Sequence, residues 1–138
     1  MLLYPQSAWL AGMYNEYLAE RVREFLRRRQ VPTEEKRMMG GLCFMARGKM
    51  AVGVERERLM VRFDPERTAE VMARAGAAPM DFTGRPMRGF VFVSAEGWDR
   101  AADLAWWLEL ALDFNPRAKS SKKKPATRAL PPRRATRR

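Results

Sequence analysis

The chain has 138 residues, which is enough for one domain with a hydrophobic core but not for two. It contains no histidine and one cysteine, Cys43, which excludes Ser-His-Asp and Cys-His catalysis, histidine metal ligands and an intrachain disulfide. The single cysteine is typical of a reducing compartment, so we expect a cytoplasmic protein. The net charge is +11, but ten of the 27 basic residues and none of the 16 acidic ones lie in residues 116–138. The remainder of the chain therefore carries a net charge of only +1.

Residues 1–12 are mildly apolar but lack a basic n-region, so we do not expect a signal peptide. No stretch approaches the roughly 20 apolar residues that cross a bilayer, and the sequence therefore predicts no membrane partner. A helix is predicted next, because apolar residues recur at i, i+3, i+4, i+8, i+11 and i+12 from Tyr14 to Leu26. Pro32 is expected to end this helix.

Strands are predicted near 35–39 running into 42–46, at 49–55 and at 58–63. Gly40-Gly41 is interpreted as a bulge or sharp bend within the first of them, and Arg47-Gly48-Lys49 as a turn. A short helix over 66–75, capped by Asp64, precedes two more strands at 80–82 and 88–93 and a last helix over 97–114. We therefore predict an α+β, two-layer fold whose antiparallel sheet has about five strands, in the order α-β(3)-α-β(2)-α.

The last predicted helix carries an apolar arc that is wider than one contact with a sheet requires. Trp106, Leu110 and Phe114 extend this arc around the helix. We expect them to form a homodimer or partner face. The alternative is that the N-terminal extension covers the same strip within one chain.

A series of short motifs follows in a fixed order along the chain. These are Arg37-Met38-Met39-Gly40-Gly41, Gly48-Lys49-Met50, the segment 59–64, the segment 86–93 and a Trp-rich last helix. In this order they resemble the N-terminal domain of the TfoX/Sxy family over roughly residues 14–114. The resemblance implies an α+β fold of the secretion-chaperone-like type and a regulatory role near transcription, as in competence regulators that act with a partner transcription factor.

The start of the family pattern also resembles the segment that begins at Met13. We therefore expect an extension over 1–12 with Met13 as the true start, a TfoX N-terminal-like domain over 13–115, and a tail over 116–138. The tail is rich in Pro, Ser, Lys and Arg and is expected to be disordered. It would attract nucleic acid without sequence preference or act only as a solubilising segment, and both interpretations remain open. Its basic residues are Arg117, Lys119, Lys122, Lys123, Lys124, Arg128, Arg133, Arg134, Arg137 and Arg138.

The functional prediction is a non-enzymatic regulatory module without cofactor or metal, which binds a protein partner. Cys43 lies in an apolar strand and lacks a histidine to activate it, so we interpret it as a buried structural thiol. The alternative is a small anionic-ligand binder or adaptor with a tail for solubility alone. In that case Arg37, Arg62 and Arg88, which lie on or near predicted strands, would converge on the ligand.

Overall fold

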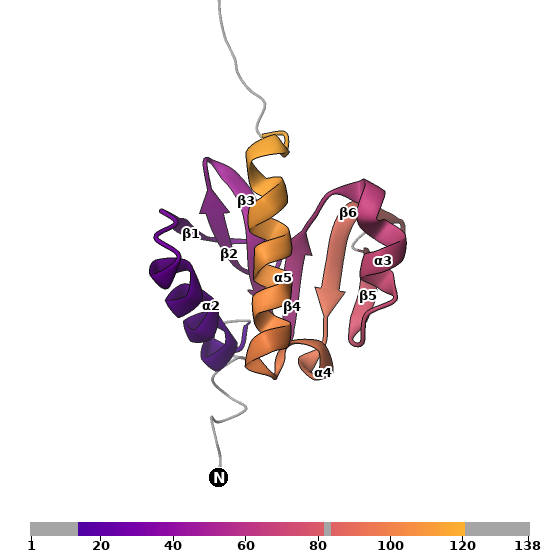
Figure 1. Ribbon diagram of the computed structural model, residues 1–138, viewed down its shortest axis with the longest axis horizontal. Helices are drawn as coiled ribbons and strands as arrows, with labels where there is room; N and C mark the ends of the chain where they lie inside the picture. Colours follow the sequence, from indigo (N-terminus) through magenta and orange to yellow (C-terminus); the bar gives the residue numbers. More distant parts are fainter. Residues whose placement is uncertain (1–13, 82–83, 121–138) are drawn as a thin grey trace, which may run out of the picture.

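One antiparallel sheet of six strands forms the centre of the molecule, and the helices lie across one of its faces (Figure 1). The computed structural model describes residues 14–81 and 84–120. The strands are arranged in the order β1-β2-β3-β4-β6-β5. Their bounds are Glu34–Met38, Gly41–Ala46, Lys49–Glu55, Arg58–Arg62, Ala77–Asp81 for β5 and Pro86–Val93 for β6. The α+β class and the antiparallel sheet predicted from the sequence are confirmed.

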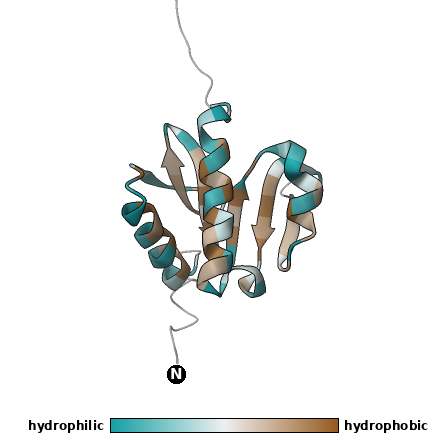
Figure 2. Cartoon of the chain, viewed as in Figure 1, coloured by the Kyte–Doolittle hydropathy of each residue, from teal (hydrophilic) through white to brown (hydrophobic). Residues whose placement is uncertain are grey.

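Helix α2 (Glu16–Arg28) is the amphipathic helix predicted near the start of the chain. Asn15 caps it, because its side-chain oxygen accepts a hydrogen bond of 3.0 Å from the backbone N–H of Leu18. The residues of this helix that are buried in the core are apolar, and Figure 2 shows hydrophobic and hydrophilic residues interleaved along its ribbon. The buried residues recur at helical spacing: Leu18, Ala19, Val22 and Leu26.

The first predicted strand is in fact two strands, which corrects the count from five to six. β1 and β2 pair antiparallel, and Met38 lies opposite Gly41. The two residues between them, Met39 and Gly40, both have positive φ, at +56° and +78°. That is the type I′ geometry favoured by two-residue hairpins. The chain therefore reverses at Met39-Gly40, and Gly41 begins β2, instead of Gly40-Gly41 bending one strand.

The helices in the second half of the chain differ from the prediction in their bounds. The short helix is a 3₁₀ turn, η1 (Pro65–Arg67), followed by α3 (Thr68–Met72), and Asp64 caps η1 through the N–H of Glu66 as expected. The last helix is divided into α4 (Ala95–Trp98) and α5 (Ala101–Phe114). Gly97 of α4 packs so closely on the carbonyl of Ala75 that no side chain would fit there. This contact fixes the orientation of α4.

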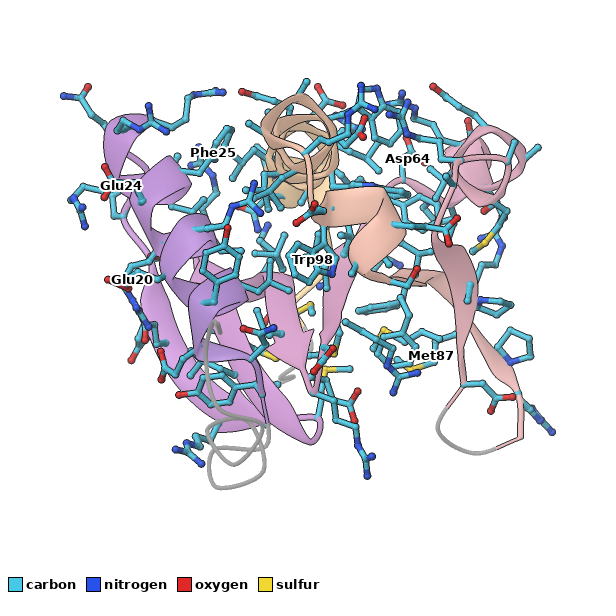
Figure 3. All side chains as sticks on the ribbon, turned by 90° about the horizontal axis from the view of Figure 1, so that it is seen from below. Glu20, Glu24, Phe25, Asp64, Met87 and Trp98 are labelled. Carbon is cyan, nitrogen blue, oxygen red and sulfur yellow. The ribbon has the colours of Figure 1, made fainter. Side chains whose placement is uncertain are left out.

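Two separate apolar clusters lie on the two faces of the sheet. The helix-side cluster contains the buried residues of α2, α3, α4 and α5 together with alternate residues of the strands, such as Leu59 and Val61 of β4. Figure 3 shows the helices on this side, with Trp98 packed beneath them. The methionine cluster is formed, among the described residues, by strands and their turns alone. Its buried members are Cys43, Met45, Met50, Met60, Met80 and Phe92, and its half-buried members are Met38, Met39, Met87 and Phe90.

The chain remains attached to the sheet after α5. A last 3₁₀ turn, η2 (Asn115–Arg117), places the buried amide of Asn115 3.1 Å from the carbonyl oxygen of Ala46, to which it donates a hydrogen bond. Lys49 donates to the carbonyl of Ala118 at 2.8 Å, and Arg62 to that of Lys119 at 2.9 Å. Within the described ranges, no helix is both long and apolar enough to cross a membrane.

Candidate functional site

The predicted partner face on α5 is partly covered by arginines of the same chain. Trp106 is half-buried, and the guanidinium of Arg74 lies 3.7 Å from the centre of its indole. Phe114 is also half-buried, with Arg117 5.4 Å from its ring. Leu110 is only 4% exposed and belongs to the helix-side cluster, so it offers a partner almost no surface. The homodimer remains a prediction, with Trp106 and Phe114 as its accessible residues.

The motif Arg37-Met38-Met39-Gly40-Gly41 builds the first hairpin. A Cβ atom at position 41 would lie 2.1 Å from the carbonyl oxygen of Val54, so only glycine fits against β3. Met38 and Met39 pack against the methionine cluster, and the guanidinium of Arg37 lies 5.5 Å from the centre of the Tyr14 ring. The contacts of this motif are therefore those of a structural hairpin.

Two of the ten basic tail residues lie in the described part of the chain. Arg117 pairs with Asp64 at 3.3 Å and with Asp113 at 3.7 Å, and the side chain of Lys119 is exposed. The other eight lie outside the described residues: Lys122, Lys123, Lys124, Arg128, Arg133, Arg134, Arg137 and Arg138.

The three strand arginines named as a candidate anion site do not converge. Arg37 is next to the end of β1 and Arg62 ends β4, and two strands lie between them, which separates them by at least roughly 14 Å. Arg88 lines a cavity of about 420 Å³ beside β6 to which neither of the others contributes. Burial lowers the pKa of Arg62, whose guanidinium lies over the Phe90 ring. The prediction of a shared three-arginine site is wrong.

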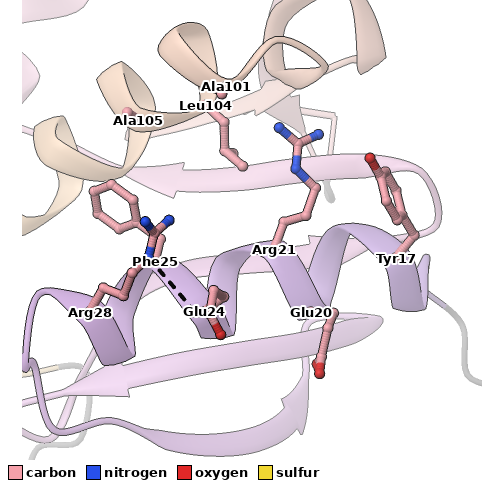
Figure 4. A pocket seen from close by; sticks show the side chains of 9 residues that line it. All are labelled: Tyr17, Glu20, Arg21, Glu24, Phe25, Arg28, Ala101, Leu104 and Ala105. Carbon is pink, nitrogen blue, oxygen red and sulfur yellow. Dashed lines mark ion pairs between the residues drawn. The ribbon is translucent and has the colours of Figure 1, made fainter.

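A cavity of about 340 Å³ between α2 and α5 contains an arginine that the sequence analysis did not select (Figure 4). The side chain of Arg21 rises from α2 into the space below α5. Its guanidinium lies 5.5 Å from the Tyr17 ring and 5.9 Å from the Trp98 ring. Its Nη1 atom is buried, and in the described part of the chain it has no hydrogen-bond partner. The cavity is lined by Tyr17, Glu20, Arg21, Glu24, Phe25, Arg28, Ala101, Leu104 and Ala105.

The TfoX N-terminal domain matches residues 24–115, which is two thirds of the chain. The chain belongs to the TfoX N-terminal domain family. No curated protein matches it, and no solved structure does. The TfoX match begins within α2 and ends directly after α5, so it covers the whole sheet and the helices α3, α4 and α5.

The cysteine of this TfoX domain is poorly suited to nucleophilic chemistry. Cys43 is fully buried in β2, and burial raises the pKa of its thiol to about 11. Its thiol donates a hydrogen bond to the carbonyl oxygen of Met38, 3.7 Å from Sγ. The reactive thiolate is therefore scarce near neutral pH. Across residues 14–81 and 84–120, no three acidic or sulfur ligands are grouped as a metal site would require.

Proposed function

We propose that this TfoX domain is a non-enzymatic regulatory module in the control of competence and DNA uptake, which acts by contact with a protein partner. The match to the TfoX N-terminal domain over residues 24–115 carries this proposal. The absence of histidine and the raised pKa of the one cysteine support a role without catalysis.

The tail supplies a second element of the same proposal. Ten basic residues and no acidic one lie in 116–138, whereas the rest of the chain is nearly neutral. Such a segment attracts nucleic acid through the release of counterions. The bonds of Asn115, Lys49 and Arg62 hold the chain on the sheet as far as Lys119, so the tail leaves from a fixed place on the domain. In this proposal the domain binds its partner while the tail raises the concentration of the complex near nucleic acid.

Binding of duplex DNA and RNA over a series of salt concentrations tests the role of the tail. The control variant keeps the full length and replaces the eight basic residues of 121–138 with glutamine, because the anchored segment 115–120 then stays intact. We expect the natural chain to bind with an affinity that falls steeply with salt, and the neutralised chain to bind at least about a hundredfold more weakly. Equal binding by the two chains would contradict the tail's role, and no binding by either would leave the tail as a solubilising segment.

The regulatory role has a separate test. Disruption of the gene in its host is expected to lower the transcripts of DNA-uptake genes and the frequency of transformation. The full-length gene should restore both. Unchanged transcripts in the disrupted strain would contradict the proposal.

A further inference from the structure

The half-buried Arg21 lacks the carboxylate partner that an arginine at such a site normally has. Nη1 is buried without a hydrogen-bond partner among the described residues, and no carboxylate there forms an ion pair with Arg21. A buried polar atom without a partner costs free energy, because it has lost its water and gained no acceptor. Arg21 is unusual in this respect, because Glu24 lies three residues further along the same helix, within reach of an ion pair.

The two acidic residues beside the cavity are already paired with other arginines. Glu20 pairs with Arg23, which also forms a two-bond contact with Glu35. Glu24 pairs with Arg27, and its other oxygen lies 3.8 Å from Arg28. In Figure 4 the carboxylate of Glu20 points away from the space that Arg21 enters. The charge of Arg21 is therefore the unbalanced one at this site.

The surroundings of Arg21 hold its guanidinium in place. The rings of Tyr17 and Trp98 both lie within 6 Å of it, at 5.5 and 5.9 Å. Trp98 is itself fixed, because it is 3% exposed and its indole N–H donates to the carbonyl of Glu57 at 3.1 Å. An arginine that is held in this way loses little freedom when it binds an anion.

One wall of the cavity is apolar, whereas the charged residues that also line it already form ion pairs: Glu20, Glu24 and Arg28. Phe25 of α2 and the side chains of Ala101, Leu104 and Ala105 of α5 form the apolar wall (Figure 4). A volume of about 340 Å³ falls in the range that small ligands occupy. Arg28 also lines the cavity but lies 3.8 Å from Glu24, so Arg21 is the cation there without an ion pair among the described residues. An apolar wall beside such a cation suits a ligand with an apolar body and one negative group.

We propose that the cavity between α2 and α5 binds a small apolar carboxylate, whose oxygens accept hydrogen bonds from the guanidinium of Arg21. The apolar part of the ligand lies against Phe25 and Leu104. Binding gives the guanidinium of Arg21 a charged acceptor and removes apolar surface from water. The ligand also bridges α2 and α5, so its presence would be felt by both helices.

Isothermal titration calorimetry of the full chain with 3-phenylpropionate tests the proposal. The matched ligand is 3-phenylpropionamide, which has the same shape without the charge. We expect the carboxylate to bind at least about tenfold more tightly than the amide, since a charge-assisted hydrogen bond is lost with the amide. Absence of carboxylate binding at millimolar concentration, or equal binding of the two ligands, would overturn the proposal.

Two variants locate the binding at Arg21. Arg21→Met removes the cation and places an apolar side chain beside the apolar wall of Phe25 and Leu104, so we expect the chain to fold and to lose the preference for the carboxylate. Arg28→Met is the control, because Arg28 lines the same cavity but already faces Glu24. We expect it to retain the preference. Should Arg21→Met fail to fold, Arg21→Lys keeps the charge without the planar fork, and we expect weaker carboxylate binding; unchanged binding in either Arg21 variant would contradict the assignment.

Discussion

The two faces of the sheet are built from different kinds of apolar side chain. On the helix side, β4 contributes Leu59 and Val61, which pack with tryptophans and with branched residues of the helices. On the other side the same strand contributes Met60, which lies among methionines, Cys43 and Phe92. Leu59, Met60 and Val61 have no exposed surface at all. One strand thus separates a core of stiff side chains from a core of flexible ones.

This difference in side-chain type affects how each face of the sheet responds to a substitution. Branched and aromatic side chains have few rotamers and fix the positions of the helices that they contact. Methionine has three rotatable bonds and fills irregular space, so it accommodates a neighbour that changes shape. Arginines also lie on the methionine side, with Arg58 3.6 Å from the centre of the Phe92 ring. We therefore expect the helix side to define the fold and the methionine side to tolerate substitution.

The largest expected effect comes from Trp107 on the helix side. Its side chain is fully buried, and its indole N–H donates to the carbonyl of Gly97 at 3.0 Å. We expect Trp107→Ala to lower the free energy of unfolding by about 3–5 kcal/mol, measured by urea denaturation. Trp106→Ala is the matched control on the same helix, because Trp106 is only half-buried, and it should cost clearly less. Equal losses in the two variants would mean that the contacts of α5 with the sheet do not dominate stability.

Alanine substitutions at two buried glycines compare a contact with rigid backbone and a contact with a flexible methionine side chain. A Cβ at Gly41 would meet the carbonyl oxygen of Val54 at 2.1 Å, and a backbone atom cannot move aside. A Cβ at Gly53 would meet the terminal methyl of Met60 at 2.6 Å, which can rotate away, although the carbonyl of Leu42 at 3.1 Å limits the space. We expect Gly41→Ala to cost more than about 3 kcal/mol and Gly53→Ala about 1–3 kcal/mol. Thermal and urea unfolding of both variants measures the difference, and an equal cost would show that Met60 does not yield.

The first hairpin shows what local sequence can and cannot predict. Gly40 and Gly41 indicated a special backbone geometry, and the structure has one, but a bulge and a type I′ turn both use glycine. The decisive residue is Met39, whose φ of +56° is uncommon for an unbranched apolar side chain. The helix α2 followed from periodicity and the antiparallel sheet from short turns such as Arg47-Gly48-Lys49, and both signals are local. Whether this segment forms one strand or two depends on the positive φ of Met39, which the surrounding structure imposes.

The sequence does not determine whether a neighbouring glutamate pairs with Arg21, and the charge in the cavity depends on that pairing. Glu24 follows Arg21 by three residues, a spacing at which the two would be expected to pair on a helix. In the structure Glu24 pairs instead with Arg27, leaving Arg21 to the rings of Tyr17 and Trp98. Trp98 lies 77 positions further along the chain, so no local pattern places it there. The strand arginines failed as a site for a related reason, because strand order in the sheet is a property of the whole fold.

The pH dependence of stability tests whether the thiol of Cys43 is buried in the methionine cluster. Burial raises its pKa to about 11 in the folded protein, from an ordinary value of 9.0. Below pH 9 the thiol is protonated in both states, and its contribution to stability is fully present. Between pH 9 and 11 the unfolded chain loses the proton first, so stability falls with rising pH, by at most about 3 kcal/mol.

A comparison with Cys43→Ala isolates this contribution, since every other ionisable group is present in both proteins. We expect the free energy of unfolding of the natural chain to fall more steeply above pH 9 than that of the variant. Parallel profiles would show that the thiol is not desolvated. Such a result would mean that water reaches the methionine cluster, as it reaches an exposed face of a sheet.

The smallest expected effect comes from substitutions at Leu59 and Met60. These neighbours on β4 point to opposite faces of the sheet, so they compare the two faces most directly. Met60→Leu places a stiffer side chain among flexible neighbours that can adjust, and we expect a change of less than about 1 kcal/mol. Leu59→Met places a flexible side chain among stiff neighbours under the helices, where lost packing is not recovered, and we expect a loss of about 1–1.5 kcal/mol. Both positions are fully buried and the two volumes are similar, so solvent exposure and size cancel. Urea midpoints measured side by side decide the matter: if Met60→Leu costs as much as Leu59→Met, the two faces are equally rigid, and methionine content on one face does not confer tolerance.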